Sequence, residues 1–212
     1  MSNTHMNIML YNRLVSYLRF MRQLPESSPD NISSTVISAA LGVYDVQVRK
    51  DLAVVSNKGR PKIGYITKEL IKDLEHYLGY DNFTDAAIIG AGNLGHALLS
   101  YENFERYGLK IVAAFDKNPD LIGKTIGKTK VIDAEKTTNL CERLGIHIGI
   151  IAVPAQYAQE VCDQLIKGGV KAIWNFAPTS LQVPEDIILK NEDMVASLAV
   201  LTRQLIDKSA QL

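Results

Sequence analysis

The chain has 212 residues, of which 47% are hydrophobic and 22% are charged, and its formal net charge is zero. This composition is ordinary for a globular protein of one large or two small domains, and the zero net charge argues against a non-specific polycation. No apolar run reaches the ~20 residues that span a bilayer, and residues 1–9 lack the pattern of a signal peptide, so we expect neither a membrane segment nor a leader.

Three helices are predicted near the start of the chain, and two of them form a helix-turn-helix. Ser33 and Ser34 can cap a short helix, because their hydroxyl groups accept hydrogen bonds from free N–H groups. Gly42 then ends this helix, and Asp45 can cap the next one. Two short helices joined by a tight turn with a glycine are typical of a helix-turn-helix. The predicted helices cover residues 9–23, 35–41 and 45–55.

A basic hairpin is predicted after the helix-turn-helix. Gly59, Pro61 and Gly64 interrupt the chain at short intervals, as in a turn between two strands. Thr67 can then cap a fourth helix of about three turns. A helix-turn-helix followed by a basic hairpin is a winged helix, so we predict a winged-helix DNA-binding domain over residues 1–80 and a short linker after it.

Basic residues are concentrated around this hairpin. Residues 1–80 hold ten Lys and Arg against seven Asp and Glu, whereas residues 81–212 hold thirteen against sixteen. Within fourteen residues the only acid is Asp51, and the cations are Arg49, Lys50, Lys58, Arg60 and Lys62. Such a cluster can neutralise phosphates of a nucleic acid.

The pattern changes after the linker to short strands that alternate with helices. Strands that are apolar on both faces indicate a parallel sheet covered by helices on both sides, so we predict an α/β fold of the Rossmann type over residues 84–190. The strands are expected at 86–90, 109–116, 130–132, 148–153 and 172–176, and the helices at 94–101, 134–144 and 155–167. A last helix, over 192–209, carries Leu198, Leu201 and Leu205 on one stripe.

The two cysteines give no sign of a disulfide framework or a metal site. Cys141 and Cys162 each fall in a predicted amphipathic helix, and no Cys/His cluster has metal-ligand spacing. We expect both thiols to pack in the core, in a reducing cytoplasm.

A dinucleotide-binding fingerprint follows the first strand of the second domain and opens its first helix. The six residues are Gly90, Ala91, Gly92, Asn93, Leu94 and Gly95, which match G-x-G-x-x-G. Gly90 permits the tight turn, Gly92 lets the backbone approach a pyrophosphate, and Gly95 allows close packing of the helix. The helix N-terminus then offers N–H donors to the diphosphate.

The second strand ends in a carboxylate, Asp116, twenty-one residues after Gly95. A carboxylate at this place can accept hydrogen bonds from both hydroxyls of an adenosine ribose, and it repels a 2′-phosphate. The sequence therefore favours NAD⁺/NADH over the phosphorylated cofactors, although Lys117 next to it weakens the repulsion.

The chain offers little for catalysis. A dehydrogenase needs a proton donor or acceptor beside the nicotinamide. The four histidines are His5, His76, His96 and His147, and none stands where a relay is expected. No substrate domain remains beyond the Rossmann pattern, so we expect no enzyme, no catalytic residue and no small-molecule substrate that is turned over.

Five stretches, in order along the chain, resemble the Rex family of redox-sensing transcriptional repressors. The first contains VQVRKDL at residues 46–52, and the second contains the glycine loop. The resemblance covers nearly the whole chain from about residue 10. The stretches are residues 32–52, 88–101, 111–119, 151–161 and 174–185.

The resemblance implies how DNA and the cofactor are bound. In this family the helix over 45–55 enters the major groove of an A/T-rich inverted repeat, and the wing reaches the adjacent minor groove. The implied DNA-binding residues are Ser33, Ser34, Gln47, Arg49, Lys50, Lys58, Arg60 and Lys62. The implied contacts at the nicotinamide end are Val153, Pro154, Asn175, Phe176 and Tyr101.

The resemblance also implies a homodimer with a switch. The C-terminal helix, within residues 191–212, is exchanged between subunits, and Arg19, Tyr101 and Asp193 form a network that changes partners. NADH then favours a dimer that releases the operator. His96, the wing sequence and Met194 depart from the common family pattern, which affects the phosphate contact, the groove contacts and the nicotinamide stacking.

Two other functions fit parts of the same pattern. One is an NAD-dependent oxidoreductase with a DNA-binding appendage, against which the missing proton relay argues. The other is a sensor whose Rossmann domain binds coenzyme A, against which the diol-binding Asp116 argues.

Overall fold

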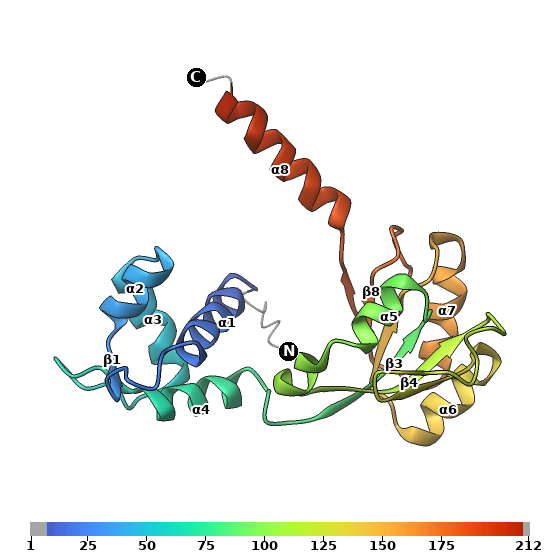
Figure 1. Ribbon diagram of the computed structural model, residues 1–212, viewed down its shortest axis with the longest axis horizontal. Helices are drawn as coiled ribbons and strands as arrows, with labels where there is room; N and C mark the ends of the chain where they lie inside the picture. The colour runs from blue at the N-terminus through green and yellow to red at the C-terminus, as the bar shows by residue number, and fades with distance from the viewer. Residues whose placement is uncertain (1–7, 210–212) are drawn as a thin grey trace. The chain divides into compact units, whose positions relative to one another are not determined.

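The computed structural model describes residues 8–209, which divide into two compact units between Asn82 and Phe83 (Figure 1). The chain passes from one unit to the other inside the predicted linker, and the predicted C-terminal segment belongs to the second unit. The expectation of no leader concerns residues that mostly lie outside the described range. Among the described residues, no helix is long and apolar enough to cross a bilayer.

The first unit is a helix-turn-helix domain with a small sheet. Helices α2 and α3 join through Gly42, whose φ of +64° is the left-handed conformation that glycine favours. The core of the first unit is formed by apolar side chains that recur at helical spacing, such as Leu14, Leu18 and Leu52. The elements are α1 (Ile8–Arg22), β1 (Asn31–Ile32), α2 (Ser34–Leu41), α3 (Asp45–Val55), β2 (Tyr65–Ile66) and α4 (Thr67–Tyr77).

Ser33 caps α2 as predicted, since its hydroxyl oxygen accepts a hydrogen bond from the Val36 N–H at 3.3 Å. The prediction that Ser34 shares this role is wrong, because Ser34 is already the first residue of the helix.

The predicted caps of α3 and α4 are also displaced by one residue. Asp45 and Thr67 are the first helical residues, and Tyr44 and Ile66 occupy the cap positions without a side-chain hydrogen bond. Inside the first turn the Asp45 carboxylate pairs with Arg49 at 2.8 Å, and its charge still suits the positive end of the helix dipole.

The wing is a tight loop rather than a hairpin of two strands. Arg60 and Gly64 exchange two backbone hydrogen bonds, at 2.8 and 2.9 Å, and form an isolated bridge. The following strand, β2, pairs antiparallel with β1, so the sheet of this unit joins the wing to the segment before α2. At the tip, Lys62 has a φ of +64°, the only positive φ of a non-glycine residue within the described range.

The second unit is a seven-stranded sheet with the order β5-β6-β4-β3-β7-β8-β9. All neighbouring strands are parallel except β5 and β6. The strands are β3 (Thr84–Ile89), β4 (Leu109–Asp116), β5 (Thr125–Ile126), β6 (Thr129–Asp133), β7 (Ile148–Ile151), β8 (Ala172–Asn175) and β9 (Ile188–Asn191). Strand β4 lies on one side of β3, and β7 lies on the other side. The strand order therefore reverses at β3, which is the topological switch point of a doubly wound fold.

The predicted strands are confirmed, but β5 and β9 were missed. Both are short, and β9 ends with Lys190 and Asn191 instead of an apolar run, so no hydrophobic pattern marks them. The helices are α5 (Asn93–Leu99), η1 (Glu102–Tyr107), η2 (Ala134–Lys136), α6 (Thr137–Leu144), α7 (Ala155–Lys167) and α8 (Met194–Ser209).

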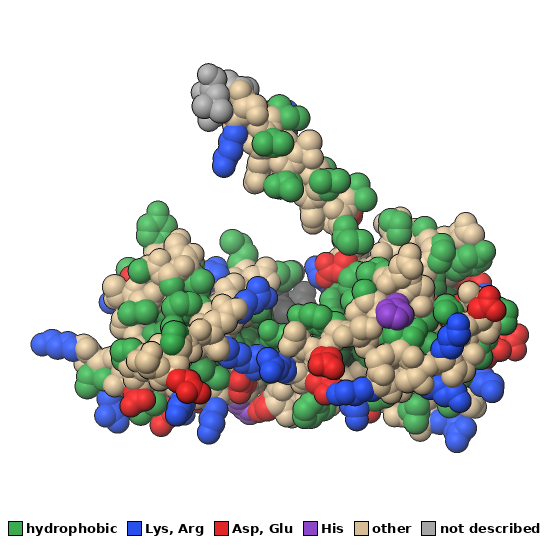
Figure 2. Space-filling model, viewed as in Figure 1, with side chains coloured by type: hydrophobic (Ala, Val, Ile, Leu, Met, Phe, Trp, Pro, Cys, Tyr) green, Lys and Arg blue, Asp and Glu red, His purple; other side chains and the backbone are tan. Residues whose placement is uncertain are grey.

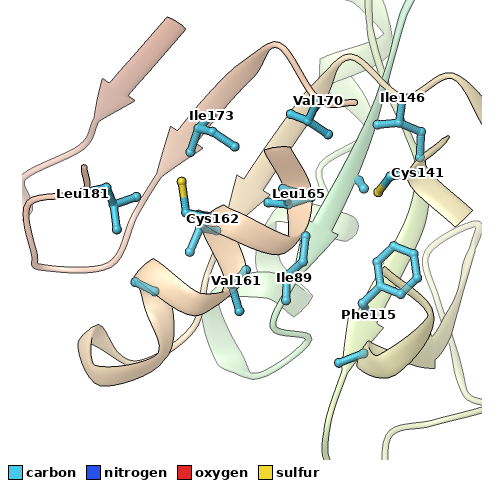
Figure 3. Close-up of a cluster of buried hydrophobic side chains, with 14 of the residues drawn as sticks. Ile89, Phe115, Cys141, Ile146, Val161, Cys162, Leu165, Val170, Ile173 and Leu181 are labelled. Carbon is cyan, nitrogen blue, oxygen red and sulfur yellow. The ribbon is translucent and has the colours of Figure 1, made fainter. Parts of the chain in front are cut away.

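Alternate residues of β3 enter two separate cores. Ala87 and Ile89 face the cluster under α6 and α7, whereas Ala86 and Ile88 face the cluster that contains α5 residues. Figure 3 shows the first cluster, with Cys141 and Cys162 among the buried side chains. Both cysteines are therefore packing residues as expected, and burial raises the pKa of each thiol to about 11.

Helix α8 has no core of its own. It starts two residues later than predicted, because β9 and a two-residue connection occupy the preceding positions. All its described side chains are exposed, including Leu198, Leu201 and Leu205 at 60%, 63% and 66%. An apolar stripe left in water marks a surface that needs a partner.

Candidate functional site

A cavity of about 300 Å³ lies at the carboxyl ends of β3, β4 and β7, at the switch point of the sheet. Ligands of doubly wound sheets bind at this place, because the loops diverge there. The lining includes Gly90, Gly92, Asp116, Lys117, Val153 and Pro154, which the sequence predicts as cofactor contacts. It also includes Ala152, Tyr157 and Gln164, which the sequence analysis missed.

The three glycines of the loop have three different reasons to lack a side chain. Gly90 has a φ of +96°, and a Cβ there would meet the Ala152 carbonyl. A Cβ on Gly95 would overlap the carbonyl oxygen of Gly90, so this glycine permits the close approach of α5 to the loop. A Cβ on Gly92 would meet nothing within 4 Å outside its chain neighbours. Packing therefore does not require a glycine at residue 92, and the open space there leaves the backbone accessible to a ligand.

Asp116 bridges the end of β4 to the glycine loop. Its Oδ2 accepts a hydrogen bond from the Ala91 N–H at 2.6 Å, and its Oδ1 accepts one from the Asn118 N–H at 2.8 Å. Each carboxylate oxygen keeps a further lone pair for a ligand. The side chain is therefore held at the cavity in one orientation, which suits a pair of ribose hydroxyls.

Lys117 contacts two side chains of α7, Tyr157 and Glu160. Its ammonium group lies 5.7 Å from the centre of the Tyr157 ring and 3.4 Å from Glu160 Oε1. These contacts weaken the argument that Lys117 offsets the negative charge of Asp116 at the ribose position. Tyr157 follows the predicted Val153–Pro154 contact by one helical turn, and this spacing is the sequence signal that could have identified it.

Asn175 and Phe176 are not among the residues that line this cavity, and their contact with the nicotinamide stays a prediction. Asn175 is fully buried. Its amide donates to the carbonyls of Ala177 and Thr179 and to Asn191 Oδ1, and it accepts from the Ala177 N–H. These internal partners occupy the amide nitrogen, so the Asn175 side chain holds the turn after β8.

Tyr101 lies beside a different hollow, of about 220 Å³, next to η1 and β6. It begins a row of ring contacts, with Tyr101–Phe104 centroids at 4.9 Å, Phe104–Trp174 at 5.8 Å and Trp174–Phe176 at 4.9 Å. The predicted residues Tyr101 and Phe176 are therefore the two ends of one aromatic row. No local sequence pattern indicates this row, because its rings come from the segments around η1 and β8, which are far apart in the chain.

The predicted DNA-binding residues gather in the first unit around a hollow of about 570 Å³. It lies between the starts of α2 and α3 and the wing, and Figure 2 shows basic side chains at the end of the wing loop. Five of the eight predicted residues line it, namely Ser33, Ser34, Arg49, Arg60 and Lys62. Lys50 and Gln47 lie on α3, where Lys50 is exposed and Gln47 is half-buried.

From the sequence, Asp51 is the acid expected to oppose these cations, but two other acids pair with them. Arg49 pairs with Asp45, and the Lys58 ammonium lies 2.8 Å from Asp73 on α4. Asp51 instead points into the core, where it binds α1. Within the described residues Lys50, Arg60 and Lys62 have no ion-pair partner, so uncompensated positive charge lies on α3 and at the wing tip.

The predicted switch residues lie in different units. Arg19 is exposed on α1 in the first unit, and Tyr101 and Asp193 belong to the second. Asp193 precedes α8 directly, and its Oδ1 accepts a hydrogen bond from the Ala196 N–H at 2.8 Å. This is the contact of an N-cap, so Asp193 has a structural role in addition to the predicted one.

Asp193→Asn and Asp193→Ala should separate these two roles. Asparagine caps a helix as well as aspartate does, whereas alanine costs about 0.5–2 kcal/mol at a cap. We expect Asp193→Asn to keep the thermal stability of the wild type and to lose the effect of NADH on DNA binding, and Asp193→Ala to lose both. Thermal unfolding and a gel shift with NADH measure the two properties. An Asp193→Asn protein that responds fully to NADH would show that the charge is not used.

No described histidine lines the cavity. His147 is exposed at the amino end of β7, which is the edge of the sheet opposite to the cavity. His96 is exposed on α5, and His76 pairs with Asp81 in the first unit. The described residues also contain no group of three His, Cys, Asp or Glu side chains that could hold a metal ion.

The comparisons with known proteins agree with this two-part arrangement. The family described as "Putative DNA-binding protein N-terminus" matches residues 10–53, and the family described as "CoA binding domain" matches residues 81–179. The chain is 39% identical over 193 residues to the redox-sensing transcriptional repressor Rex of Bacteroides fragilis, covering 91% of this chain and 88% of that relative. It is 41% identical to Rex of Clostridium beijerinckii, covering 93% of this chain and 94% of the relative. The chain belongs to the Rex family.

Solved structures extend the Rex comparison to the whole fold. A crystal structure of RSP in complex with β-NAD⁺ and operator DNA matches with a TM-score of 0.90 at 36% identity, covering 98% of this chain and 96% of that one. The complex of RSP with β-NADH matches with a TM-score of 0.86, covering 98% of each chain. The predicted winged helix and Rossmann-type sheet of a Rex repressor are thus confirmed as the fold of this chain.

Proposed function

We propose that this chain is a homodimeric repressor that binds double-stranded operator DNA and releases it when NADH occupies the cavity of the second unit. The observation that carries the proposal is the cavity at the switch point, where a glycine loop with open space at Gly92 faces the oriented carboxylate of Asp116. The same chain carries a winged helix whose hollow is lined by two unpaired cations, Arg60 and Lys62, and by Arg49. A nucleotide site and a DNA site in one chain are the two parts that a ligand-controlled repressor needs.

The cofactor is NAD⁺ or NADH. The free lone pairs of Asp116 suit the two hydroxyls of an adenosine ribose, and the carboxylate repels a phosphate on that ribose. This argues against the phosphorylated cofactors and against coenzyme A, even though the family matched at residues 81–179 is named for coenzyme A. RSP, which is similar over nearly the whole chain, was crystallised with β-NAD⁺ and with β-NADH.

The DNA site is an A/T-rich inverted repeat, read by two copies of the winged helix. Helix α3 presents Arg49 and Lys50 to the major groove, and the wing brings Arg60 and Lys62 to the minor groove. Narrow minor grooves of A/T-rich DNA attract such cations. RSP was crystallised with operator DNA.

The cofactor is sensed and not consumed. The histidines within the described range are away from the cavity, and its titratable lining groups, Asp116, Lys117 and Tyr157, are engaged with the loop or with one another. A hydride-transfer enzyme needs a proton donor beside the nicotinamide, and the lining supplies no histidine for it.

The test is a gel shift with an A/T-rich palindrome at fixed salt. NADH should weaken the complex about 5- to 150-fold, and NAD⁺ should leave it intact. By linkage, operator DNA must weaken NADH binding by the same factor, which calorimetry measures independently. Equal shifts with NADH, with NAD⁺ and with no ligand would exclude the sensor mechanism.

The wing cations should contribute unequally to DNA binding. Arg60→Gln and Lys62→Gln should each weaken binding to all sequences and lower the slope of log affinity against log salt by about one, because each removes a phosphate-neutralising charge. Lys58→Gln should have a smaller effect, because Asp73 already compensates the Lys58 charge. Operator titrations at several salt concentrations measure the slopes. An equal loss in all three variants would contradict this ranking.

A further inference from the structure

Asp51 is a buried carboxylate in the middle of α3, with a relative exposure of 3%. Both of its oxygens are shared. Oδ2 accepts hydrogen bonds from Arg13 Nε at 2.6 Å and from the Tyr17 hydroxyl at 2.9 Å. Oδ1 accepts from Arg13 Nη2 at 2.8 Å and from the Gln47 amide nitrogen at 2.7 Å. The Asp51 carboxylate therefore connects two side chains of α1 to Gln47 on α3, the predicted recognition helix.

Asp51 acts only as an acceptor at neutral pH. Burial alone would raise the pKa of its carboxyl group, but the hydrogen bonds from Arg13, Gln47 and Tyr17 outweigh burial and lower it below the ordinary value. Burial and the hydrogen bond to Asp51 raise the pKa of the Tyr17 phenol to about 12, so Tyr17 remains a donor. Arg13 has no acceptor atom at all.

This acceptor fixes the orientation of the Gln47 amide. An amide can present either its nitrogen or its oxygen to a neighbour, but a carboxylate oxygen accepts only from the nitrogen. The Gln47 nitrogen therefore faces Asp51, and the carbonyl oxygen is turned away from it. Gln47 lies near the N-terminus of α3, which is the part of a recognition helix that contacts base edges.

We propose that Asp51 is a positioning residue for sequence recognition: it holds the Gln47 amide so that its carbonyl oxygen, an acceptor, meets a base amino group in the major groove. This inference rests on the proposed DNA-binding function. The bases with an amino group in the major groove are adenine and cytosine, whereas guanine and thymine present keto oxygens. Gln47 thus selects an amino base at one position of each half-site.

Asp51→Asn should weaken this selection. The asparagine replaces one carboxylate oxygen by an NH₂ group, which can take the place of Oδ2, beside Arg13 and Tyr17, or of Oδ1, beside Arg13 and Gln47. In the second orientation the Gln47 amide turns its oxygen towards the NH₂ group, and its nitrogen becomes the outward group. The position that preferred an amino base should then accept a keto base as well.

The experiment is a binding-site selection from random duplexes with the full chain, followed by competition among all single-base variants of the selected half-site. The Gln47-dependent position is the one whose preference disappears in Gln47→Met, which keeps the length of the side chain without its amide. The preference lost there should be about 5- to 150-fold. Tyr17→Phe is the matched control, because it removes one hydrogen bond to the same carboxylate without touching Gln47. It should lower stability and leave the base preferences unchanged.

Each outcome bears on the inference. A smaller preference for the amino base in Asp51→Asn at the Gln47-dependent position supports it. An unchanged profile in Asp51→Asn, or an unchanged profile in Gln47→Met, overturns it while the proposed function stands. Should Asp51→Asn fail to fold, the wild type still decides: removing the exocyclic amino group from the adenine or cytosine of the Gln47-dependent base pair should weaken binding, and an unchanged affinity overturns the inference. If the wild type selects no sequence, the proposed function fails together with the inference.

Discussion

Gly92→Ala should fold like the wild type and lose the binding of NADH. The new Cβ enters open space, and the φ of −67° at this residue is accessible to alanine, so the free energy of unfolding should change by less than about 1 kcal/mol. The same Cβ would occupy the space through which the backbone approaches a pyrophosphate. We expect at least about a hundredfold loss of NADH affinity, since several charge-assisted hydrogen bonds to the phosphates are disturbed together.

Gly95→Ala is the matched control for this prediction. Its Cβ would overlap the carbonyl oxygen of Gly90, and backbone atoms cannot give way as a side-chain tip can. We expect the stability of the second unit to fall by about 3 kcal/mol or more. Calorimetric titration with NADH and thermal unfolding separate the two variants. A Gly92→Ala protein that binds NADH with wild-type affinity would show that no phosphate approaches this loop.

Leu201→Glu should convert the dimer into monomers and reduce operator affinity about 10²- to 10⁴-fold. Leu198, Leu201 and Leu205 form the stripe of α8 that the chain leaves exposed, and Figure 2 shows hydrophobic side chains along this helix. A glutamate in the middle of the stripe would bury an unpaired charge in any interface formed there. A dimer binds two half-sites at once, and this gain in effective concentration is lost in a monomer.

Ala196→Glu provides the control for Leu201→Glu. Ala196 lies on the opposite side of α8, which also carries the Arg203–Asp207 ion pair. It should introduce the same charge into the same helix without changing the oligomeric state. Sedimentation analysis gives the mass of each variant, and operator titration gives its affinity. If Leu201→Glu remains a dimer, the exposed stripe of α8 is not the interface.

Local sequence patterns were sufficient for most elements of the fold. The strands over 109–116 and 172–175 and the helix over 155–167 follow from runs and periodicities that their own residues carry. Strands β5 and β9 escaped, because they are short and are held by hydrogen bonds to β6 and β8. The caps at Asp45 and Thr67 were displaced by one residue, since a cap depends on where the chain enters the helix.

The residues of the candidate site could also be identified from the sequence only in part. The glycine loop, Asp116 and the wing cations could be named from the sequence, because their chemistry is written in residue type and spacing. The sequence could not show that the Asn175 amide is occupied by the turn after β8, or that the Lys58 charge is paired with Asp73. It also placed Asp51 among the wing charges, whereas the carboxylate binds Arg13 and Tyr17 in the core.

The sequence by itself determined the two kinds of domain, the nucleotide loop and the membership of a family of repressors. Only the tertiary structure decided which polar side chains are free to meet a ligand and which already have partners. The physical reason is that a residue's hydrogen-bonding capacity is a property of its type, whereas its use depends on groups far away in the chain. Asp51 shows this, because Arg13 and Tyr17 reach its carboxylate from α1, and Asn175 shows it in part, because one of its partners, Asn191, lies on β9.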